Sequence, residues 1–120
     1  MKVAVIGSRD LYINIGKYIE KYIGAENITM IISGGARGID TLAEEYAYEN
    51  NIPTKIFYPD YDKDGATAPI RRNAEIVDAA DIVVAFWDKQ SRGTGFVIDY
   101  AKKTGKKLIE VRVNVNYEQI

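Results

Sequence analysis

Between an apolar run and an amphipathic segment, the chain reads Ser33-Gly34-Gly35-Ala36-Arg37-Gly38-Ile39-Asp40. The run before it, residues 28–32, predicts a buried strand, and residues 39–50 have the apolar spacing of a helix. In a glycine-rich turn between a strand and a helix, backbone N–H groups can point at a phosphate, and glycines leave room for its approach. The stretch therefore predicts a site for a phosphate-bearing ligand.

Strands and helices are predicted to alternate along the whole chain. Apolar runs predict strands over residues 2–6, 28–32, 55–57, 82–86 and 108–113, and helices are predicted over about 13–23, 39–50, 70–79 and 94–103. Continuously apolar strands that alternate with helices are typical of a parallel sheet covered on both faces. We therefore expect an α/β fold, a Rossmann-like doubly wound parallel sheet of about five strands with helices on both faces, as a single domain over residues 1–120.

The composition excludes several kinds of chemistry. The chain of 120 residues contains no cysteine and no histidine, so disulfides, thiolate metal sites and histidine catalysis are excluded. The formal net charge of −1 gives no overall attraction to nucleic acid or to an anionic membrane. No apolar run approaches the length of a membrane span, and the N-terminus does not have the pattern of a signal peptide. We expect a cytoplasmic protein without a metal site or membrane contact.

Four loops are expected to meet at one edge of the sheet, because ligands of doubly wound folds bind beyond the carboxyl ends of the strands. Arg37, inside the glycine-rich turn, is the strongest single candidate, since arginine can bind phosphate through two parallel hydrogen bonds. The candidate ligand-binding residues are Gly7, Ser8, Arg9, Ser33, Gly34, Gly35, Arg37, Gly38, Asp40, Arg72, Asn73, Ser91, Gly93 and Thr94.

Each of these groups also has a purely structural interpretation. Gly7-Ser8-Arg9 suits any tight turn after a strand, and Ser91 or Thr94 could cap a helix. Arg71-Arg72 could form a solvated helix face. Because all four groups are expected at the same edge, together they favour a site more strongly than any one of them does alone.

Two further features have more than one interpretation. The polar segment 58–69 is long for a loop of a compact domain, and its aspartates have the spacing of a calcium loop that begins at Asp60. The twelfth position of that pattern is Arg71 rather than glutamate, which favours a solvated loop. Trp87, at the end of the fourth predicted strand, could stack on a base or cover the edge of the core.

Several of these segments together resemble the SLOG superfamily. The resemblance is carried by Val5-Ile6-Gly7-Ser8-Arg9, the stretch 33–40, Tyr58-Pro59, Arg71-Arg72-Asn73 with Ile76, and Ser91-Arg92-Gly93-Thr94. That superfamily unites the DNA-processing Smf/DprA proteins with the LOG-type nucleoside-monophosphate phosphoribohydrolases. The chain is most similar to the small stand-alone YspA-type branch. The resemblance implies a Rossmann-like domain that binds nucleotides or nucleotide-derived ligands at these loops.

The chain also departs from both groups of that superfamily. The LOG-type motif has a catalytic glutamate three residues after the threonine, where this chain has Val97, although Arg72 matches the LOG-type arginine. The catalytic residues of such a reaction are therefore unknown, with Asp40 and Arg72 as candidates. Smf/DprA proteins bind single-stranded DNA, but this chain is slightly acidic and its lysines at 102–107 lie far from the expected site. DNA is therefore not the expected partner.

Three functions follow from these observations. The preferred one is binding of a phosphate-bearing nucleotide or nucleotide-derived ligand, as a sensor or sequestering domain, with no other cofactor required. The alternatives are a nucleotide hydrolase of the phosphoribohydrolase type, with a carboxylate such as Asp40 as acid or base, and a single-stranded DNA binder. We also expect a homodimer, because the aromatic residues exceed what four short helices need for a core.

Overall fold

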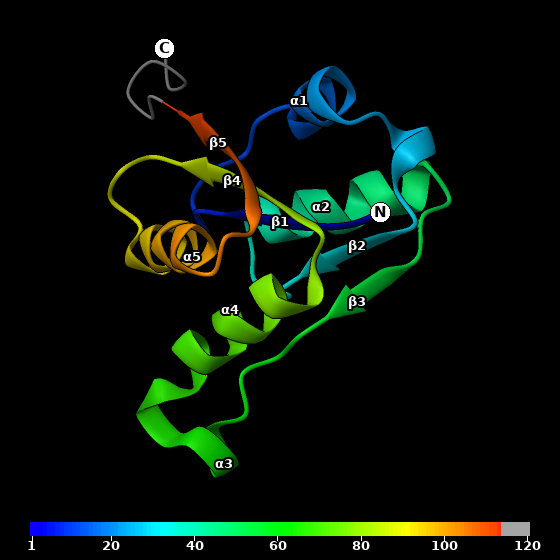
Figure 1. The fold of residues 1–120 in the computed structure, drawn as a ribbon. Coiled ribbons are helices and arrows are strands. Elements are labelled where there is room, and N and C mark those ends of the chain that lie inside the picture. Colours follow the sequence, from blue (N-terminus) through cyan, green and yellow to red (C-terminus); the bar gives the residue numbers. More distant parts are fainter. Residues whose placement is uncertain (114–120) are drawn as a thin grey trace.

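The computed structural model describes residues 1–113, and a parallel five-stranded sheet forms its centre (Figure 1). Across the sheet the strands are β3 (Thr54–Ile56), β2 (Met30–Ser33), β1 (Lys2–Gly7), β4 (Ile82–Trp87) and β5 (Lys107–Arg112). Every neighbouring pair is parallel, which confirms the predicted Rossmann-like α/β fold. The order of connection reverses between β1 and β4, and a crevice is expected there at the carboxyl ends of the strands.

Helices cover both faces of this sheet (Figure 1). The helices α1 (Ile15–Tyr22) and α2 (Ile39–Glu49) pack on one face, and α4 (Ala68–Ala79) and α5 (Arg92–Lys103) pack on the other. In residues 1–113, none of the helices has both the length and the apolar character that crossing a bilayer requires.

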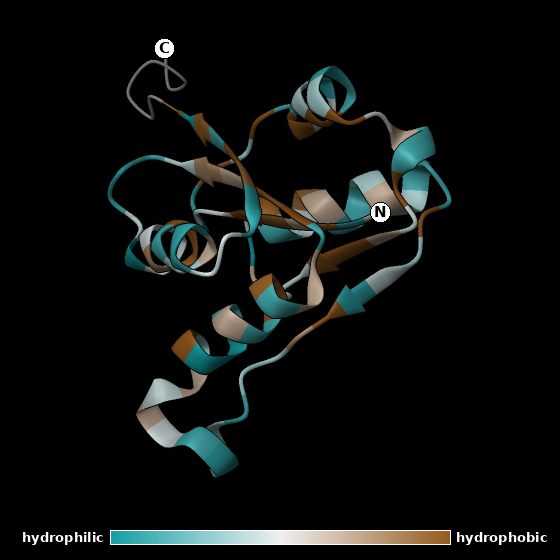
Figure 2. Cartoon of the chain, in the orientation of Figure 1, coloured by the Kyte–Doolittle hydropathy of each residue, from teal (hydrophilic) through white to brown (hydrophobic). Residues whose placement is uncertain are grey.

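The core consists of two apolar layers, one on each side of the sheet. Side chains alternate along β1, so that Val5 packs toward α1 and α2 while Ile6 packs toward α4 and α5. Phe86 is fully buried in the first layer and Val97 in the second. Figure 2 shows the apolar strands between helices that are polar on their outer sides. The sheet is therefore rigidly held, and its carboxyl edge is a fixed platform for the loops.

The observed bounds of the predicted helices and strands differ from the expected ones by up to two residues, and in two segments a local turn or short helix explains the difference. The second strand begins at Met30 rather than at residue 28, because a 3-10 turn, Ala25–Asn27, precedes it. The segment 58–69 contains a short helix, α3 (Tyr61–Asp64), and a 3-10 turn, Gly65–Thr67, instead of a loop. Asp60 caps α3, since its carboxylate accepts a hydrogen bond from the Lys63 N–H at 3.1 Å.

Candidate functional site

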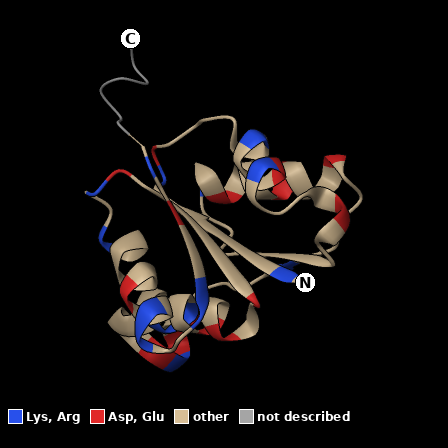
Figure 3. Cartoon of the chain, turned by 45° about the horizontal axis from the view of Figure 1, so that its top comes forward, with Lys and Arg blue, Asp and Glu red and all other residues tan. Residues whose placement is uncertain are grey.

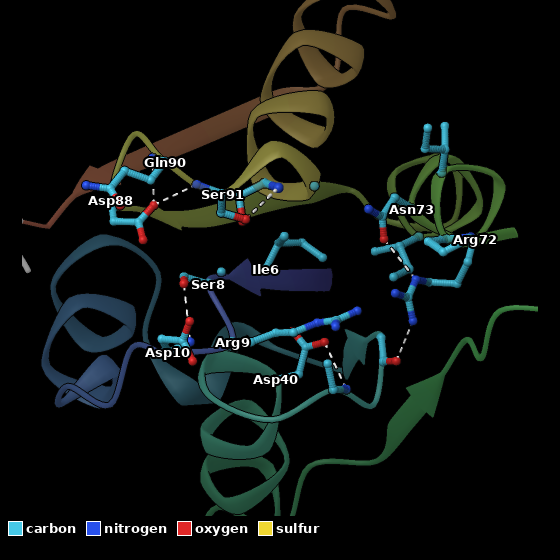
Figure 4. Close-up of a pocket in the computed structure, with 18 residues that line it drawn as sticks. Ile6, Ser8, Arg9, Asp10, Asp40, Arg72, Asn73, Asp88, Gln90 and Ser91 are labelled. Carbon is cyan, nitrogen blue, oxygen red and sulfur yellow. Dashed lines mark hydrogen bonds between the residues drawn. The ribbon is translucent and has the colours of Figure 1, made fainter. Parts of the chain in front are cut away.

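An open cavity lies where the strand order reverses, between the carboxyl ends of β1 and β4 (Figure 4). It has a volume of about 500 Å³ and is lined by the loops after β1, β2 and β4 and by the first turns of α4. A second cavity of about 320 Å³ lies toward β3. The two share Arg9, Gly34, Ala36 and Arg72, so together they form one cleft, which we call the edge cleft.

Most of the residues singled out in the sequence line the edge cleft. The first cavity is lined by Gly7, Ser8, Arg9, Gly34, Asp40, Arg72, Asn73, Ser91, Gly93 and Thr94, and the second adds Gly35 and Arg37. Two predicted residues, Ser33 and Gly38, do not line it. Ser33 is fully buried, and its hydroxyl has no hydrogen-bond partner within residues 1–113. Gly38 is buried against the backbone of the loop after β1.

Arg72 is buried at the floor of the edge cleft and joins three segments of the chain. One terminal nitrogen of its guanidinium donates to the Gly34 carbonyl oxygen at 2.6 Å and to the Phe57 carbonyl oxygen at 3.2 Å. Its Nε donates to the Asn73 side-chain oxygen at 2.8 Å. Burial lowers the pKa of Arg72, an effect that the neighbouring Asp40 carboxylate opposes. The residue therefore holds the loops after β2 and β3 against α4.

Asp40 is buried beside Arg72, and its carboxylate accepts a hydrogen bond from the Ala36 N–H at 3.1 Å. Burial raises the pKa of Asp40, while the Ala36 hydrogen bond and the charges of Arg72 and Arg9 act in the opposite direction. Figure 4 shows the Arg9 side chain lying over Asp40 and reaching across the cavity toward Arg72. Asp40 thus fastens its own turn and faces two guanidinium groups.

Asp40, the carboxylate of the glycine-rich stretch itself, accepts the Ala36 N–H and is not the ion-pair partner of Arg37. Arg37 instead pairs with Asp10 at 3.1 Å, and both side chains are largely exposed at the rim of the edge cleft. An exposed pair of this kind is held weakly and exchanges readily with solvent or with another anion. Arg37 is therefore available to a ligand, as expected, but its partner in the free protein was missed.

Three backbone donors of the glycine-rich stretch are engaged within the protein. The Ala36 N–H donates to Asp40, the Gly38 N–H donates to the Tyr12 hydroxyl at 3.2 Å, and the Ile39 N–H donates to the Ser8 carbonyl oxygen at 3.3 Å. Amides that already have partners do not cradle a phosphate without losing those bonds. These three amides therefore do not supply the predicted phosphate cradle.

An internal carboxylate also fills the turn before α5. Asp88 accepts the N–H groups of Gln90 and Ser91 at 2.8 and 2.9 Å. Burial raises the pKa of Asp88, but these hydrogen bonds and one from the Ser8 hydroxyl together lower it by more, so that the net shift is downward. Asp88 is therefore ionised at neutral pH. Ser91 caps α5 by accepting the Thr94 N–H at 3.3 Å. The Gln90 and Ser91 amides before α5 are thus engaged by Asp88, which was not among the candidate site residues.

The charges around the edge cleft nearly balance. Three arginines and three aspartates line it: Arg9, Arg37, Arg72, Asp10, Asp40 and Asp88. Figure 3 shows the same mixture over the molecule, with basic and acidic residues interspersed on the helices of both faces. Residues 1–113 therefore present a mixed surface rather than a broad positive one, and an anion in the cleft is recognised by local contacts with individual guanidinium groups.

Trp87, which the sequence analysis considered as a residue that could stack on a base, is not an exposed aromatic residue of this edge. Trp87 is half-buried, its indole N–H donates to the Ser91 carbonyl oxygen at 3.0 Å, and its ring packs on Gly95, so it covers the core edge. Tyr12 and Tyr58 are instead exposed beside the glycine-rich turn. Their positions after β1 and β3 were visible in the sequence, but their exposure was not.

The loops of the edge cleft lie largely within the part of the chain that matches a known family. The family model of DNA recombination-mediator protein A matches residues 1–60. This half of the chain contains β1, β2, β3 and the glycine-rich turn. The chain belongs to this family. The DprA-like part of the SLOG resemblance is thereby confirmed, and its YspA-type branch stays a prediction.

Individual relatives agree with this assignment. The chain is 33% identical over 86 residues to the Gene 61 protein of Mycobacterium phage D29, an alignment that covers 67% of this chain and 69% of that protein. It is 42% identical over 71 residues to the DNA processing protein DprA of Streptococcus pneumoniae, covering 52% of this chain and 25% of that protein. The chain is therefore similar to only about a quarter of the pneumococcal protein's length.

Two solved structures share the fold. The crystal structure of Streptococcus pneumoniae DprA matches with a TM-score of 0.77 and 25% identity, covering 95% of this chain and 51% of that chain. DprA of Helicobacter pylori matches with a TM-score of 0.71 and 23% identity, covering 97% of this chain and 67% of that chain.

These findings correct the preferred functional prediction. A sensor of a small nucleotide ligand is wrong, because the chain belongs to a family of DNA-processing proteins and shares the fold of DprA. The prediction of a small-molecule partner rather than DNA is wrong for the same reason. That prediction relied on the net charge of −1, but a net charge describes the whole chain rather than one cleft. The predicted homodimer stays a prediction.

The fold places no carboxylate at the position of the LOG-type glutamate. Val97, at the position of the LOG-type glutamate, is fully buried between α5 and the sheet. Asp40 and Arg72, the candidate catalytic residues, are both engaged in holding loops together.

Proposed function

We propose that this domain binds single-stranded DNA along the edge cleft, and that it does so in the cytoplasm. The observation that carries the proposal is the shared lining of the cleft, in which the arginines Arg9, Arg37 and Arg72 and the aromatic side chain Tyr58 meet. DNA processing protein A of Helicobacter pylori, which has the same fold, has a single-stranded DNA binding mode.

A single strand suits the chemistry of the edge cleft better than a small phosphate ligand does. Guanidinium groups on flexible side chains can follow a sugar-phosphate backbone, and exposed aromatic rings can stack on unpaired bases. Arg37 at the rim contacts phosphate by exchanging its partner, so that a phosphate oxygen replaces the Asp10 carboxylate. Arg9 is exposed over the first cavity and supplies a second such contact.

The balanced charge of the edge cleft limits the number of phosphates that the protein neutralises. With about two contacts, from Arg37 and Arg9, the logarithm of the affinity should fall with the logarithm of salt concentration with a slope of roughly −1.4, since each phosphate of a single strand contributes ~0.7. We expect stacking of bases on the aromatic rings to supply much of the remaining affinity, and this contribution should depend little on salt.

The test is fluorescence anisotropy of a labelled oligothymidylate titrated with the protein at several salt concentrations. Arg37→Ala should weaken binding about fivefold, or ~1 kcal/mol, and Asp10→Asn should strengthen it, because Arg37 then no longer has a competing carboxylate. Both side chains are exposed, so neither change should unfold the protein.

Lys103→Ala is the matched control, because Lys103 is an exposed cation at the far end of α5 from the edge cleft. It should leave the affinity unchanged. A wild-type protein that fails to bind at low salt, or that loses as much affinity on Lys103→Ala as on Arg37→Ala, contradicts the proposal.

A further inference from the structure

We infer that Tyr12 and Tyr58 select single-stranded over duplex DNA by stacking on unpaired bases on the two sides of the glycine-rich turn. This inference rests on the proposed function and adds to it the two residues that distinguish the form of the nucleic acid. Both side chains are exposed, 62% for Tyr12 and 69% for Tyr58, although each has a fixed contact with the turn.

Tyr58 is seated on one side of the turn by the glycine below it. A Cβ atom at Gly35 would lie 2.7 Å from the Tyr58 ring, so only glycine lets the ring rest on the turn at this distance. Gly35 also has a φ of 71°, which favours glycine for a second reason. Tyr58 lines the second cavity together with Arg37 and Arg72, so a base on its ring would lie beside two guanidinium groups.

Tyr12 is held on the other side of the turn by its hydroxyl group. That hydroxyl accepts the Gly38 N–H at 3.2 Å, while most of the residue remains open to solvent. A ring fixed at one end loses little conformational freedom when a base stacks on it, which favours binding. The hydrogen bond therefore presents Tyr12 in a position that an unanchored surface tyrosine would only sample.

The order of the strands places the Tyr12 and Tyr58 rings on opposite sides of the glycine-rich turn. The glycine-rich turn follows β2, and its neighbours in the sheet are β1, which leads to Tyr12, and β3, which leads to Tyr58. Because β2 lies between them, β1 and β3 are two strand spacings apart, ~10 Å. The rings contact the turn at different glycines, Gly38 for Tyr12 and Gly35 for Tyr58, so each is placed to stack on its own base of one strand.

Stacking at these positions selects the form of the nucleic acid. The base faces of a duplex are covered by their neighbours, so a protein ring cannot stack on them without opening the helix. Unpaired bases present a free face, and each base–aromatic contact is largely independent of sequence. The rings thus add affinity for a single strand and none for a duplex of the same backbone charge.

The experiment uses fluorescence anisotropy to compare a labelled oligothymidylate with two oligomers of equal length that offer no free base face. One is an abasic deoxyribose-phosphate oligomer, and the other is the oligothymidylate paired with its complement, which should behave as the abasic oligomer does in every comparison. The wild type should bind the oligothymidylate at least tenfold more tightly than the abasic oligomer. Tyr58→Ala and Tyr12→Ala should each weaken binding of the oligothymidylate about tenfold, the effect of losing one stacked base, and leave binding of the abasic oligomer unchanged. Tyr12→Phe, which keeps the ring, should retain more of the preference than Tyr12→Ala.

Tyr48→Ala is the matched control. Tyr48 is 86% exposed in the last turn of α2, roughly 13 Å along the helix axis from its first residue. Its removal should change none of these affinities. If Tyr58→Ala and Tyr12→Ala keep the wild-type preference for the oligothymidylate, the inference is overturned while the proposed function stands. If the wild type binds none of these oligomers at low salt, both are overturned.

Discussion

At the scale of single residues, Arg72 shows how the floor of the edge cleft is held. Its guanidinium binds two carbonyl oxygens and an amide oxygen from three segments, and it faces the buried Asp40. A guanidinium offers five donors in one plane, which suits such a junction. The sequence identified Arg72 as a ligand-binding candidate, but a partner such as the Phe57 carbonyl oxygen depends on the fold and could not be inferred from the pattern.

Arg72→Ala should lower the free energy of unfolding by about 3 kcal/mol, because it leaves buried carbonyl oxygens without their donor and Asp40 without its neighbouring cation. Urea unfolding measures this difference. Arg71→Ala is the control, since that neighbouring side chain is 67% exposed, and it should change stability by less than ~0.5 kcal/mol. Equal losses in the two variants would show that Arg72 is not a structural junction.

Asp40 should make stability depend on pH in the direction opposite to that of a salt-bridged surface carboxylate. Its folded-state pKa is raised above the ordinary value of 3.8, so the folded protein holds this proton more strongly than the unfolded chain does. The resulting stability is present below the unfolded-state pKa and is lost as the pH rises through the folded-state pKa. Asp40→Asn keeps an oxygen for the Ala36 N–H and removes the titration.

The melting temperature of Asp40→Asn relative to the wild type should therefore rise as the pH increases from about 3.8 through the folded-state pKa of Asp40. Thermal unfolding followed by circular dichroism over this pH range measures the difference. A difference that stays constant, or that falls with rising pH, would show that the carboxylate is not destabilised by burial.

At the scale of elements, apolar runs located the strands because strands of a covered parallel sheet are apolar throughout. Their boundaries depended on local hydrogen bonds that periodicity does not reveal. The turn Ala25–Asn27 shortens the second strand, and the Asp60 cap turns part of segment 58–69 into a helix. Asp60 was visible in the sequence, but its segment was predicted to be a solvated loop rather than a capped helix.

The junction between β2 and α2 depends on Gly38. Replacing Gly38 by alanine would introduce both backbone strain and a steric collision, and a second glycine allows the two effects to be separated. Gly38 has a φ of 74°, and an added Cβ would collide with the backbone oxygens of Ser8 and Arg9. Gly105 has nearly the same φ, 72°, with nothing within 4 Å of an added Cβ. Gly105→Ala should therefore cost only the backbone strain, ~1 kcal/mol.

Gly38→Ala should cost at least about 2 kcal/mol more than Gly105→Ala and should also weaken DNA binding, because the loop after β1 has to move away from the turn. Urea unfolding and anisotropy on the same two variants measure both effects. If the two variants lose the same stability, the contact between the turn and the loop does not hold the edge cleft in shape.

At the scale of the whole molecule, the edge that carries the cleft could be predicted because the strands of a parallel sheet all end at one edge, whereas the strand order was seen only in the structure. What the loops do there could not be predicted. The sequence shows that glycines, aspartates and arginines meet, but not that Asp40 and Asp88 engage the amides, or that Tyr12 and Tyr58 face solvent. Each of those facts depends on side-chain contacts between segments that are distant in the chain.

The most direct test of the account is a map of the backbone amide resonances of the uniformly ¹⁵N-labelled protein during titration with an oligothymidylate. We predict shifts in the loops around the edge cleft, at residues 8–12, 34–38, 58 and 90–94, and little change at the far ends of α2 and α5. Shifts confined to those far ends, or none at all at low salt, would contradict the assignment of single-stranded DNA to this cleft.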